Sequence, residues 1–242
     1  MMIRNIECDT TPIVIHNNGP YRRPFFYRLR RRVFSSRRKI RTRDLDLTIF
    51  TWNNKPRKGC FERSLDALGL DYFVTGKKVI EWRNIFKVAL NHEFLKRVET
   101  TYVMAADSSD VLLLEDPRRV IEKMEARPGC LMLFNAERNH YPSRCHTKRF
   151  EEKVFAESTT LEVRSDRRYF RYLNAGVWIA RTDFCRSLHE EAVQVKPPFS
   201  RDDQGIYKLL YKRHYPSIQI DHDCAVFQTL WMTKPEEFEM ME

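Results

Sequence analysis

The stretch at residues 102–114 reads YVMAADSSDVLLL and places two aspartates, Asp107 and Asp110, between two apolar runs. An ionised carboxylate that is buried without a partner is costly, so something has to compensate this pair. The end of a strand at the edge of a sheet, with a cation beside it, would do so. The stretch therefore predicts a strand whose carboxyl end carries a cation site.

Strand-like and helix-like patterns alternate around this stretch, through residues 44–242. Strands are expected over 45–52, 71–76, 101–107 with the loop that follows, 130–137, 174–180 and twice within 217–230. Helices are expected over 60–70, 80–98, 117–126, 182–195 and 202–213. This alternation predicts a single-domain α/β fold with a mainly parallel, mixed sheet flanked by helices. Such sheets bind ligands outside the carboxyl ends of their strands.

Composition excludes several classes of protein. The chain has 242 residues, 42% of them hydrophobic, which suffices for a sizeable core. No apolar run approaches the ~20 residues that span a bilayer, and the glycines form neither a dinucleotide fingerprint nor a phosphate-binding P-loop. The six cysteines are scattered without a C-x-x-C pair. This pattern predicts reduced thiols and a cytoplasmic location, or the host cytoplasm for a viral protein.

The net charge of +10 comes from one short segment. Residues 21–43 hold eleven arginines and lysines and no acidic residue, whereas the rest of the chain carries 32 basic and 33 acidic side chains. The arginines expected to contact phosphates are Arg22, Arg23, Arg28, Arg30, Arg31, Arg32, Arg37 and Arg38. Aromatic residues lie among them, which suits a nucleic acid and base stacking. The alternative is a solvated basic linker without a specific partner.

Several blocks in a fixed order resemble one enzyme family. They read YVMAADSSDVLLLEDP, LMLFNAERNHYP, RYLNAGVWIA, RDDQGIYKLLY and IDHDCAVFQTL. Together they are similar to the glycosyltransferase domain of procollagen lysyl hydroxylases, over roughly residues 44–230. The resemblance implies a GT-A (Rossmann-like) fold, a UDP-sugar donor and Mn²⁺, or Mg²⁺, as cofactor.

One family block stands in an unexpected place. In the family, an H-x-N-G-P block follows the closing hairpin, whereas here TPIVIHNNGP precedes all the other blocks. The order resembles a circular permutation, with the cut between EEFEMME and MMIRNIE. On this interpretation residues 1–20 are the permuted C-terminal strand and metal-histidine block, 21–43 a basic linker that contacts nucleic acid, and 44–242 the GT-A catalytic core. Cuts at exposed turns are physically cheap.

The resemblance assigns roles to individual residues. Asp107, Asp110 and His16 are expected to hold the metal. The expected donor-binding residues are Phe50, Thr51, Trp52, Ser108, Ser109, Asn18, Gly19, Pro20 and Tyr141. Asp202 and Asp203 are expected to act as a base or to stabilise charge, and Asn174 to orient a sugar. His222 and Asp223 are expected to be structural. The family's Gly-rich loop before the second helix is replaced by TGKKVIEWRN, which leaves the uridine side of the pocket open.

The acceptor is inferred from charge. A nucleic acid explains the basic segment, and a 5-hydroxymethylpyrimidine base of DNA would offer the hydroxyl group once flipped from the duplex. This resembles the DNA-hypermodifying glycosyltransferases of some phages. The family resemblance alone implies hydroxylysine of a collagen-like protein. A third possibility is a catalytically silent nucleic-acid-binding module on the same scaffold. The sequence predicts neither the sugar nor the oligomeric state.

Overall fold

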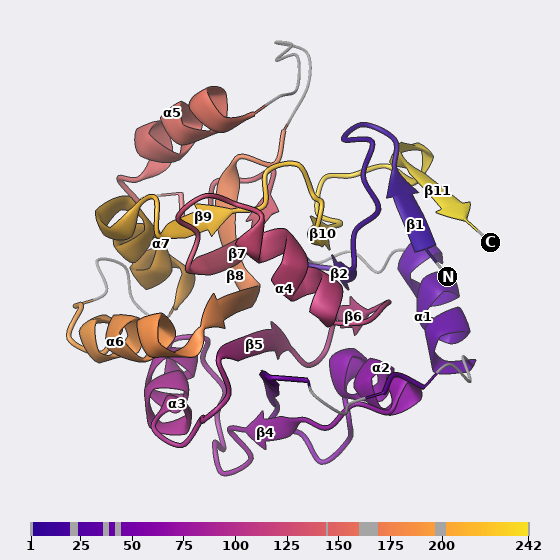
Figure 1. Ribbon diagram of the computed structural model, residues 1–242, viewed down its shortest axis with the longest axis horizontal. Helices are drawn as coiled ribbons and strands as arrows, with labels where there is room; N and C mark the ends of the chain where they lie inside the picture. The colour runs from indigo at the N-terminus through magenta and orange to yellow at the C-terminus, as the bar shows by residue number, and fades with distance from the viewer. Residues whose placement is uncertain are drawn as a thin grey trace.

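A six-stranded sheet forms the centre of the computed structural model, which describes residues 2–19, 24–35, 39–41, 45–143, 145–159, 169–196 and 202–241 (Figure 1). The strand order is β4-β3-β5-β8-β7-β9. The strands are β3 (Leu47–Trp52), β4 (Phe73–Thr75), β5 (Tyr102–Asp107), β7 (Met132–Glu137), β8 (Tyr172–Arg181) and β9 (Ile218–Ile220). β3 runs parallel to β4 and β5, and β7 parallel to β9, whereas β8 is antiparallel to β5 and β7. The expected mixed, mainly parallel sheet is confirmed.

Helices cover both faces of this sheet, as Figure 1 shows. Their bounds are α2 (Cys60–Leu68), α3 (Phe86–Leu95), α4 (Arg118–Glu125), α5 (Lys148–Ser158), α6 (Thr182–Ala192) and α7 (Gln204–His214). Successive strand residues point to opposite faces, so Phe50 packs with α3 and α6 while its neighbour Ile49 packs with α2 and α4. Two apolar layers result, one on each side of the sheet, and they fix the strand ends where polar side chains gather.

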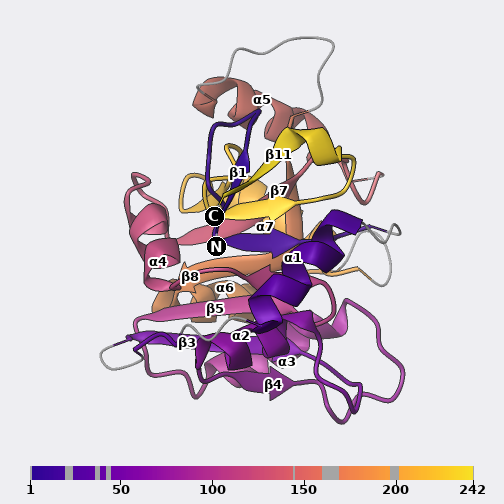
Figure 2. The same cartoon turned by 90° about the vertical axis from the view of Figure 1, so that its right-hand side faces the viewer.

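A smaller sheet brings the beginning of the chain into the core. Its order is β10-β2-β6, with β2 (Val14–His16) parallel to β10 (Phe227–Thr229) and antiparallel to β6 (Val111–Leu113). Residues 14–16 therefore lie between segments about 100 and 200 positions away in the sequence. β1 (Met2–Asn5) pairs antiparallel with β11 (Phe238–Met241), directly after a 3₁₀ turn at Pro235–Glu237. The two ends of the chain lie side by side in both views (Figures 1 and 2).

The basic segment contains a helix that the sequence analysis did not foresee. Helix α1 (Pro24–Ser35) packs its apolar side against β1, β6 and the start of α2. Phe25 and Phe26 are buried in this contact, so their rings are not free to stack on bases. Residues 24–35 are therefore a docked helix rather than a solvated linker. Arg22, Arg23, Arg37 and Arg38 lie outside the described residues.

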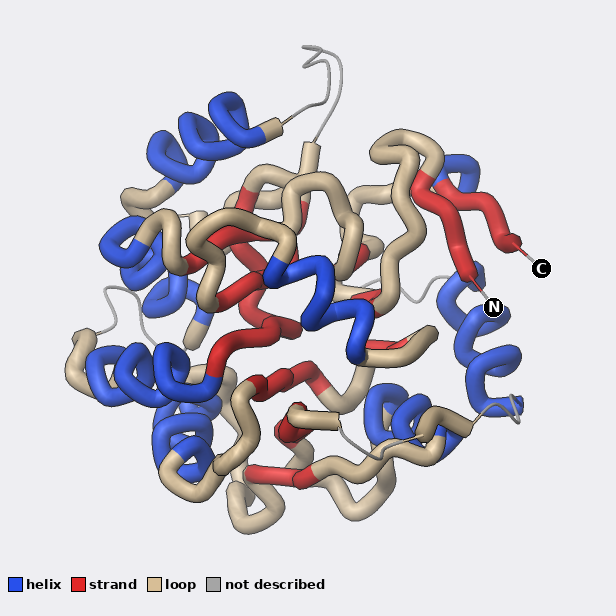
Figure 3. Tube along the Cα trace, viewed as in Figure 1, coloured by secondary structure: helices blue, strands red, loops and turns tan. Residues whose placement is uncertain are grey.

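Some element boundaries differ from the expectation, as the helix and strand colours of Figure 3 make visible. The helix expected over 80–98 begins only at Phe86, because residues 76–85 form a loop that Asn54 holds by donating to the Val79 carbonyl at 3.0 Å. β6 and α5 were not expected as separate elements. Within the described ranges, no helix is long and apolar enough to cross a membrane. All six cysteines are buried and free; a cytoplasmic location stays a prediction.

Candidate metal and nucleotide site

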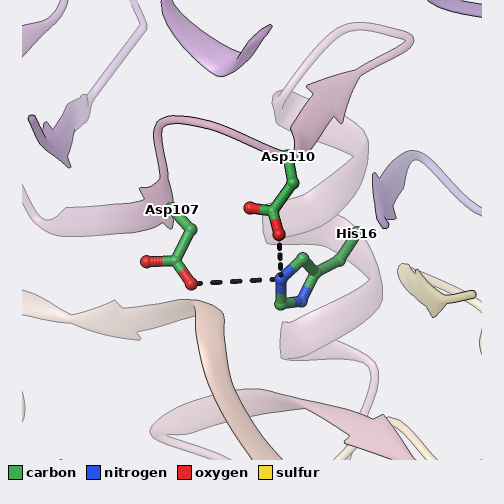
Figure 4. A group of neighbouring side chains, drawn as sticks. All are labelled: His16, Asp107 and Asp110. Carbon is green, nitrogen blue, oxygen red and sulfur yellow. Dashed lines mark ion pairs between the residues drawn. The ribbon is translucent and has the colours of Figure 1, made fainter. Parts of the chain in front are cut away.

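Three side chains from separate strand ends converge on one point (Figure 4). His16 ends β2, Asp107 ends β5, and Asp110 stands directly before β6. The His16 Nε2 atom lies 3.9 Å from Asp107 Oδ2 and 3.7 Å from Asp110 Oδ2. One potential ligand atom from each residue falls within 4.8 Å of the others. The two acids are half-exposed and the imidazole is buried, so one side of the cluster remains open to a ligand.

Local structure fixes this convergence. His16 faces Val111 in the β2–β6 register, and the N–H of Asn17 donates to the Asp110 carbonyl at 2.8 Å. Gly176 on β8 leaves room for the imidazole: a Cβ atom there would lie 2.2 Å from His16 Cε1 and 2.8 Å from Asp107 Oδ2. Behind the ring, Asn135 lies 3.3 Å from His16 Nδ1, which leaves Nε2 directed at the acids.

The electrostatics of the cluster favour a cation. Burial lowers the pKa of His16, but the Asp110 and Asp107 carboxylates raise it more, so that the pKa lies above its ordinary value. Burial raises the pKa of Asp110, and His16 outweighs this effect and holds the pKa below its usual range. A nitrogen and two carboxylate groups are a donor set that Mn²⁺ accepts. The residues present therefore fit a divalent cation.

A buried lysine joins the metal cluster to a second pair of acids. Lys87 of α3 places its Nζ atom 2.6 Å from Asp107 Oδ1 and 3.7 Å from Asp203 Oδ2. Burial lowers the pKa of Lys87, whereas Asp107 and Asp203 raise it above its ordinary value, so the ammonium group stays charged. Burial raises the pKa of Asp203 to about 7, although Lys87 acts in the opposite direction. Asp203 is thus a carboxylate that can exchange a proton near neutral pH.

The cavity beside Asp203 has a volume of about 410 Å³, and we call it the Glu137 cavity. Glu137 ends β7 and is buried, and burial raises its pKa to about 7. Gln204 donates to one Glu137 oxygen at 2.7 Å, and Asn18 donates to the other at 3.1 Å. The expected residues that line this cavity are His16, Asn18, Gly19, Asp107, Asp110, Tyr141, Asn174, Asp202 and Asp203.

A second cavity of about 660 Å³ lies on the other side of the metal cluster, and we call it the Trp52 cavity. Its wall combines aromatic rings with cations, among them Trp52, Trp82, Arg57 and Arg63. Asn84, Asp107 and Asp110 line both cavities. The three potential metal ligands therefore stand at the junction of two hollows.

Glu62 ties the loops of the Trp52 cavity together. Its Oε1 atom accepts hydrogen bonds from Asn53 Nδ2 at 2.5 Å, from the Gly59 N–H at 3.1 Å and from Ser108 Oγ at 2.6 Å. Gly59 approaches the loop so closely that an added Cβ atom would lie 2.1 Å from Ser108 Oγ. The end of β3, the start of α2 and the Asp107–Asp110 turn are thus held as one unit.

The structure places the expected donor-binding residues unequally. Phe50 and Thr51 are completely buried, and the Thr51 hydroxyl donates to the Ala106 carbonyl, so these two side chains face the core and line neither cavity. Trp52, Ser108 and Ser109 do line the Trp52 cavity. Pro20 lies outside the described residues.

The expected residues of the Glu137 cavity share a wall formed by β7, β8 and α7. Tyr141 is about half exposed at its rim, and Asp202 accepts the Gln204 N–H at 2.8 Å. The Asn174 carbonyl oxygen accepts the Gly176 N–H at 3.0 Å. His222 is buried against the Phe170 carbonyl, and Asp223 pairs with Arg127 at 2.8 Å, both away from these cavities.

Sequence reasoning missed Lys87, Glu137 and Glu62. Lys87 sits in a helix where a lysine is ordinarily solvated, so nothing in the local pattern marked it. Glu137 had a signal that was not used: an acid at the end of the apolar run LMLFNAE repeats the pattern of Asp107. Glu62 is the third residue of its helix, where an acid is expected as a cap regardless of function.

The comparison with protein families decides the identity of this site. The family model described as PLOD GT domain matches residues 49–241. The chain belongs to this family. The resemblance read from the sequence is thereby confirmed, and the fold is that of a GT-A-type glycosyltransferase. The matched range holds both aspartates of the cluster, whereas His16 lies outside it.

Among curated proteins, this PLOD GT domain is similar to the human multifunctional procollagen lysine hydroxylase and glycosyltransferase LH3. The two are 28% identical over 136 residues, which is 54% of this chain and 16% of LH3. LH3 of Pongo abelii gives the same values. The chain thus spans about a sixth of the length of these relatives at the matched region.

Solved structures with a similar arrangement include two glycosyltransferases. One is involved in the glycosylation of the major capsid of PBCV-1, with a TM-score of 0.43, 11% identity, and coverage of 79% of this chain and 96% of that chain. The other is mouse xyloside xylosyltransferase 1, with a TM-score of 0.42, 12% identity, and coverage of 85% and 82%. A Mycobacterium tuberculosis glucosyl-3-phosphoglycerate synthase in complex with Mn²⁺ and UDP gives 0.36 and 11%, with coverage of 89% and 78%.

Proposed function

We propose that this PLOD GT domain transfers a hexose or similar sugar from a UDP-sugar to a hydroxyl group, with a divalent cation held by His16, Asp107 and Asp110. The observation that carries the proposal is the position of these three ligands at the junction of two cavities. A nucleotide in the Trp52 cavity and a sugar in the Glu137 cavity would meet at the cluster. Mn²⁺ or Mg²⁺ would supply Lewis-acid stabilisation of the leaving diphosphate.

Several residues would hold the donor. In the Trp52 cavity, the indole of Trp52 and the polar turn at Ser108 and Ser109 offer contacts to base, ribose and phosphate. Cations that line the same cavity would balance the diphosphate charge. In the Glu137 cavity, Asn18, Gly19 and Tyr141 lie at the sugar side. Asn174 would orient the sugar from β8.

Asp203 is the group that we assign as the base for the acceptor hydroxyl. It is buried at the start of α7, faces the Glu137 cavity, and has a pKa raised to about 7 by burial. A base with such a pKa is half-ionised at neutral pH and takes a proton effectively. Asp202 lies beside it in the same wall and adds negative charge near the reacting sugar.

For the acceptor, we propose a 5-hydroxymethylpyrimidine base in DNA. The support is the charge distribution, because the positive excess lies in residues 21–43 and collagen is not a strongly anionic acceptor. The similarity to LH3, whose name includes procollagen lysine hydroxylase, supports hydroxylysine of a collagen-like protein as the second candidate. A silent binding module is the least economical alternative, since the ligand cluster and the buried base are both in place.

We further propose that the chain is a circular permutant of the family's order. The support is that the metal-histidine block precedes the DxxD block in sequence, while β1 pairs residue by residue with β11. A connection between these two strands would restore the order of the family.

The donor side is tested by UDP release. The wild-type protein is incubated with Mn²⁺ and a panel of UDP-sugars, beside Asp110→Asn and, as control, Asp183→Asn, whose carboxylate is almost fully exposed on α6. Loss of a metal ligand removes several kcal/mol of stabilisation, so Asp110→Asn should release UDP at less than about 1% of the wild-type rate. Full activity of Asp110→Asn, or no release with any UDP-sugar, would contradict the proposal.

The acceptor side is tested by competition. DNA containing 5-hydroxymethylcytosine or 5-hydroxymethyluracil and a hydroxylysine peptide are offered together with the donor that gives UDP release. Mass spectrometry of both acceptors then reports where the sugar is attached. Transfer to the DNA is expected; transfer to the peptide alone would establish the second candidate instead.

A further inference from the structure

Helix α1 turns a row of arginines away from the protein. Its apolar side is fully used, because Phe25, Phe26, Leu29 and Val33 are buried against β1, β6 and α2. Arg28, Arg31 and Arg32 are exposed on the opposite side, at the i, i+3, i+4 spacing of one helix face. Within the described part of the chain, no ion pair joins these three guanidinium groups to an acid. Their charge is therefore available to a partner.

A cavity of about 590 Å³ lies along the same helix, and we call it the α1 cavity. Its cations are held by aromatic rings: the guanidinium carbon of Arg30 lies 4.7 Å from the Tyr27 ring centre, and that of Arg63 lies 4.1 Å from the Phe34 ring centre. Such contacts orient the guanidinium planes without neutralising them. The hollow is therefore positively charged and has fixed side-chain directions, as a phosphate-binding surface requires.

The α1 surface is continuous with the proposed catalytic site. Arg30 and Arg63 line both the α1 cavity and the Trp52 cavity. At the other end, Pro24 starts the helix only five residues after Gly19, which lines the Glu137 cavity. Five residues span at most about 18 Å, so the helix start lies within that distance of the sugar side. A long polyanion on α1 therefore reaches the mouth of the site.

We propose that Arg28, Arg31 and Arg32, with Arg30 and Arg63 beside them, form the surface on which nucleic acid docks through its phosphates. The assignment rests on the proposed DNA acceptor, and it names the surface that seats it. An anionic membrane is the less suitable partner, because an interfacial helix inserts its apolar face and that of α1 is buried in the protein. Repeated phosphates match a row of charges that lacks an accessible apolar side.

The test measures binding without turnover. A fluorescein-labelled DNA duplex of mixed sequence is titrated with wild-type protein, with Arg28→Gln/Arg31→Gln/Arg32→Gln, and with the control Lys153→Gln/Lys196→Gln/Lys212→Gln. The control removes the same charge from α5, α7 and the end of α6, which lie on the side of the molecule opposite α1 (Figure 1). Thermal unfolding of all three proteins verifies that they are folded.

The wild-type protein and the control should bind alike, while the α1 variant should bind at least about tenfold more weakly at moderate salt. Each lost phosphate contact lowers the slope of log K against log salt by about 0.9, so the α1 variant should lose about 2 to 3. Equal binding by the folded α1 variant, no binding by the wild type, or binding to phosphatidylserine vesicles in place of DNA would each overturn the assignment. Mn²⁺-dependent UDP release is measured in parallel. Its failure would refute the proposed donor chemistry and leave the docking result to be judged separately.

Discussion

Gly176 limits how closely a neighbouring side chain can approach the metal cluster. A Cβ atom at this position would overlap His16 and crowd Asp107, so Gly176→Ala must displace one of the two. We expect a loss of Mn²⁺ affinity of about 10- to 100-fold, as for other changes that misplace metal ligands. Calorimetric titration with Mn²⁺ measures it. Gly205→Ala is the matched control, because an added Cβ atom there only contacts Pro142 at 3.5 Å; equal affinity of the two variants would contradict the geometry.

Lys87 is the second residue whose replacement has a defined consequence. Lys87→Met leaves the Asp107 and buried Asp203 carboxylates without their ammonium partner, which should lower the free energy of unfolding by about 3–5 kcal/mol at pH 8. The loss should be smaller at pH 6, because Asp203, with a pKa of about 7, is then protonated and uncharged. Denaturant titrations at both pH values measure this difference. Adding Asp203→Asn should recover part of the stability at pH 8, and no recovery would show that the two groups are not coupled.

At the scale of elements, a buried hydrogen-bond network joins α3, α6 and α7. His189 Nδ1 lies 2.8 Å from the Cys185 carbonyl, so this nitrogen donates its proton. The other nitrogen, Nε2, faces the Tyr207 hydroxyl at 2.9 Å and the Asn91 amide at 3.1 Å. Asn91 also accepts from Trp52 Nε1 at 2.7 Å, which links the network to the cavity wall. A second proton on His189 would disrupt this arrangement.

The network predicts acid sensitivity. Burial lowers the pKa of His189 from 6.5 to about 4, so the unfolded chain takes up the proton first as the pH falls. The stabilisation is present above pH 6.5 and is lost as the pH falls towards 4, by up to about 3 kcal/mol. His189→Gln should be less stable at pH 7 and should show a flatter stability profile between pH 6.5 and 4. Urea unfolding across this range measures both profiles; parallel profiles would exclude His189 as the cause.

Element type was predictable wherever a long periodic pattern was present. The strands ending in Asp107 and Glu137 and helices α2, α4, α6 and α7 follow from apolar periodicity. Helix α1 was overlooked because its arginines dominated the reading, although Phe25, Leu29 and Val33 recur at helical spacing. The start of α3 was misplaced because residues 80–85 have helical composition, while a side chain from another loop, Asn54, holds the preceding segment in place.

At the scale of the whole molecule, the pairing of β1 with β11 makes the chain order testable. A variant that runs from residue 39 to 241, continues through a short turn into residue 2 and ends at residue 35 keeps every described pairing of the two sheets. The new turn joins strands that are already antiparallel neighbours, with Met2 opposite Met241. We expect a folded protein whose Tm lies within several degrees of the wild type and whose Mn²⁺ affinity is unchanged. Thermal unfolding and calorimetry measure this, and a variant that does not fold would contradict a permuted order.

The sequence by itself determined the α/β class, the glycosyltransferase family and the acidic turn at Asp107 and Asp110. These follow from local periodicity and from the order of short blocks, which survive without knowledge of any contact. Only the tertiary structure decided that Lys87 and Glu137 belong to the site, that Phe50 faces the core, and that the metal cluster separates two cavities. These properties depend on burial and on distances between residues far apart in the chain. A lysine or glutamate becomes chemically unusual only when packing removes its water and places a charge beside it.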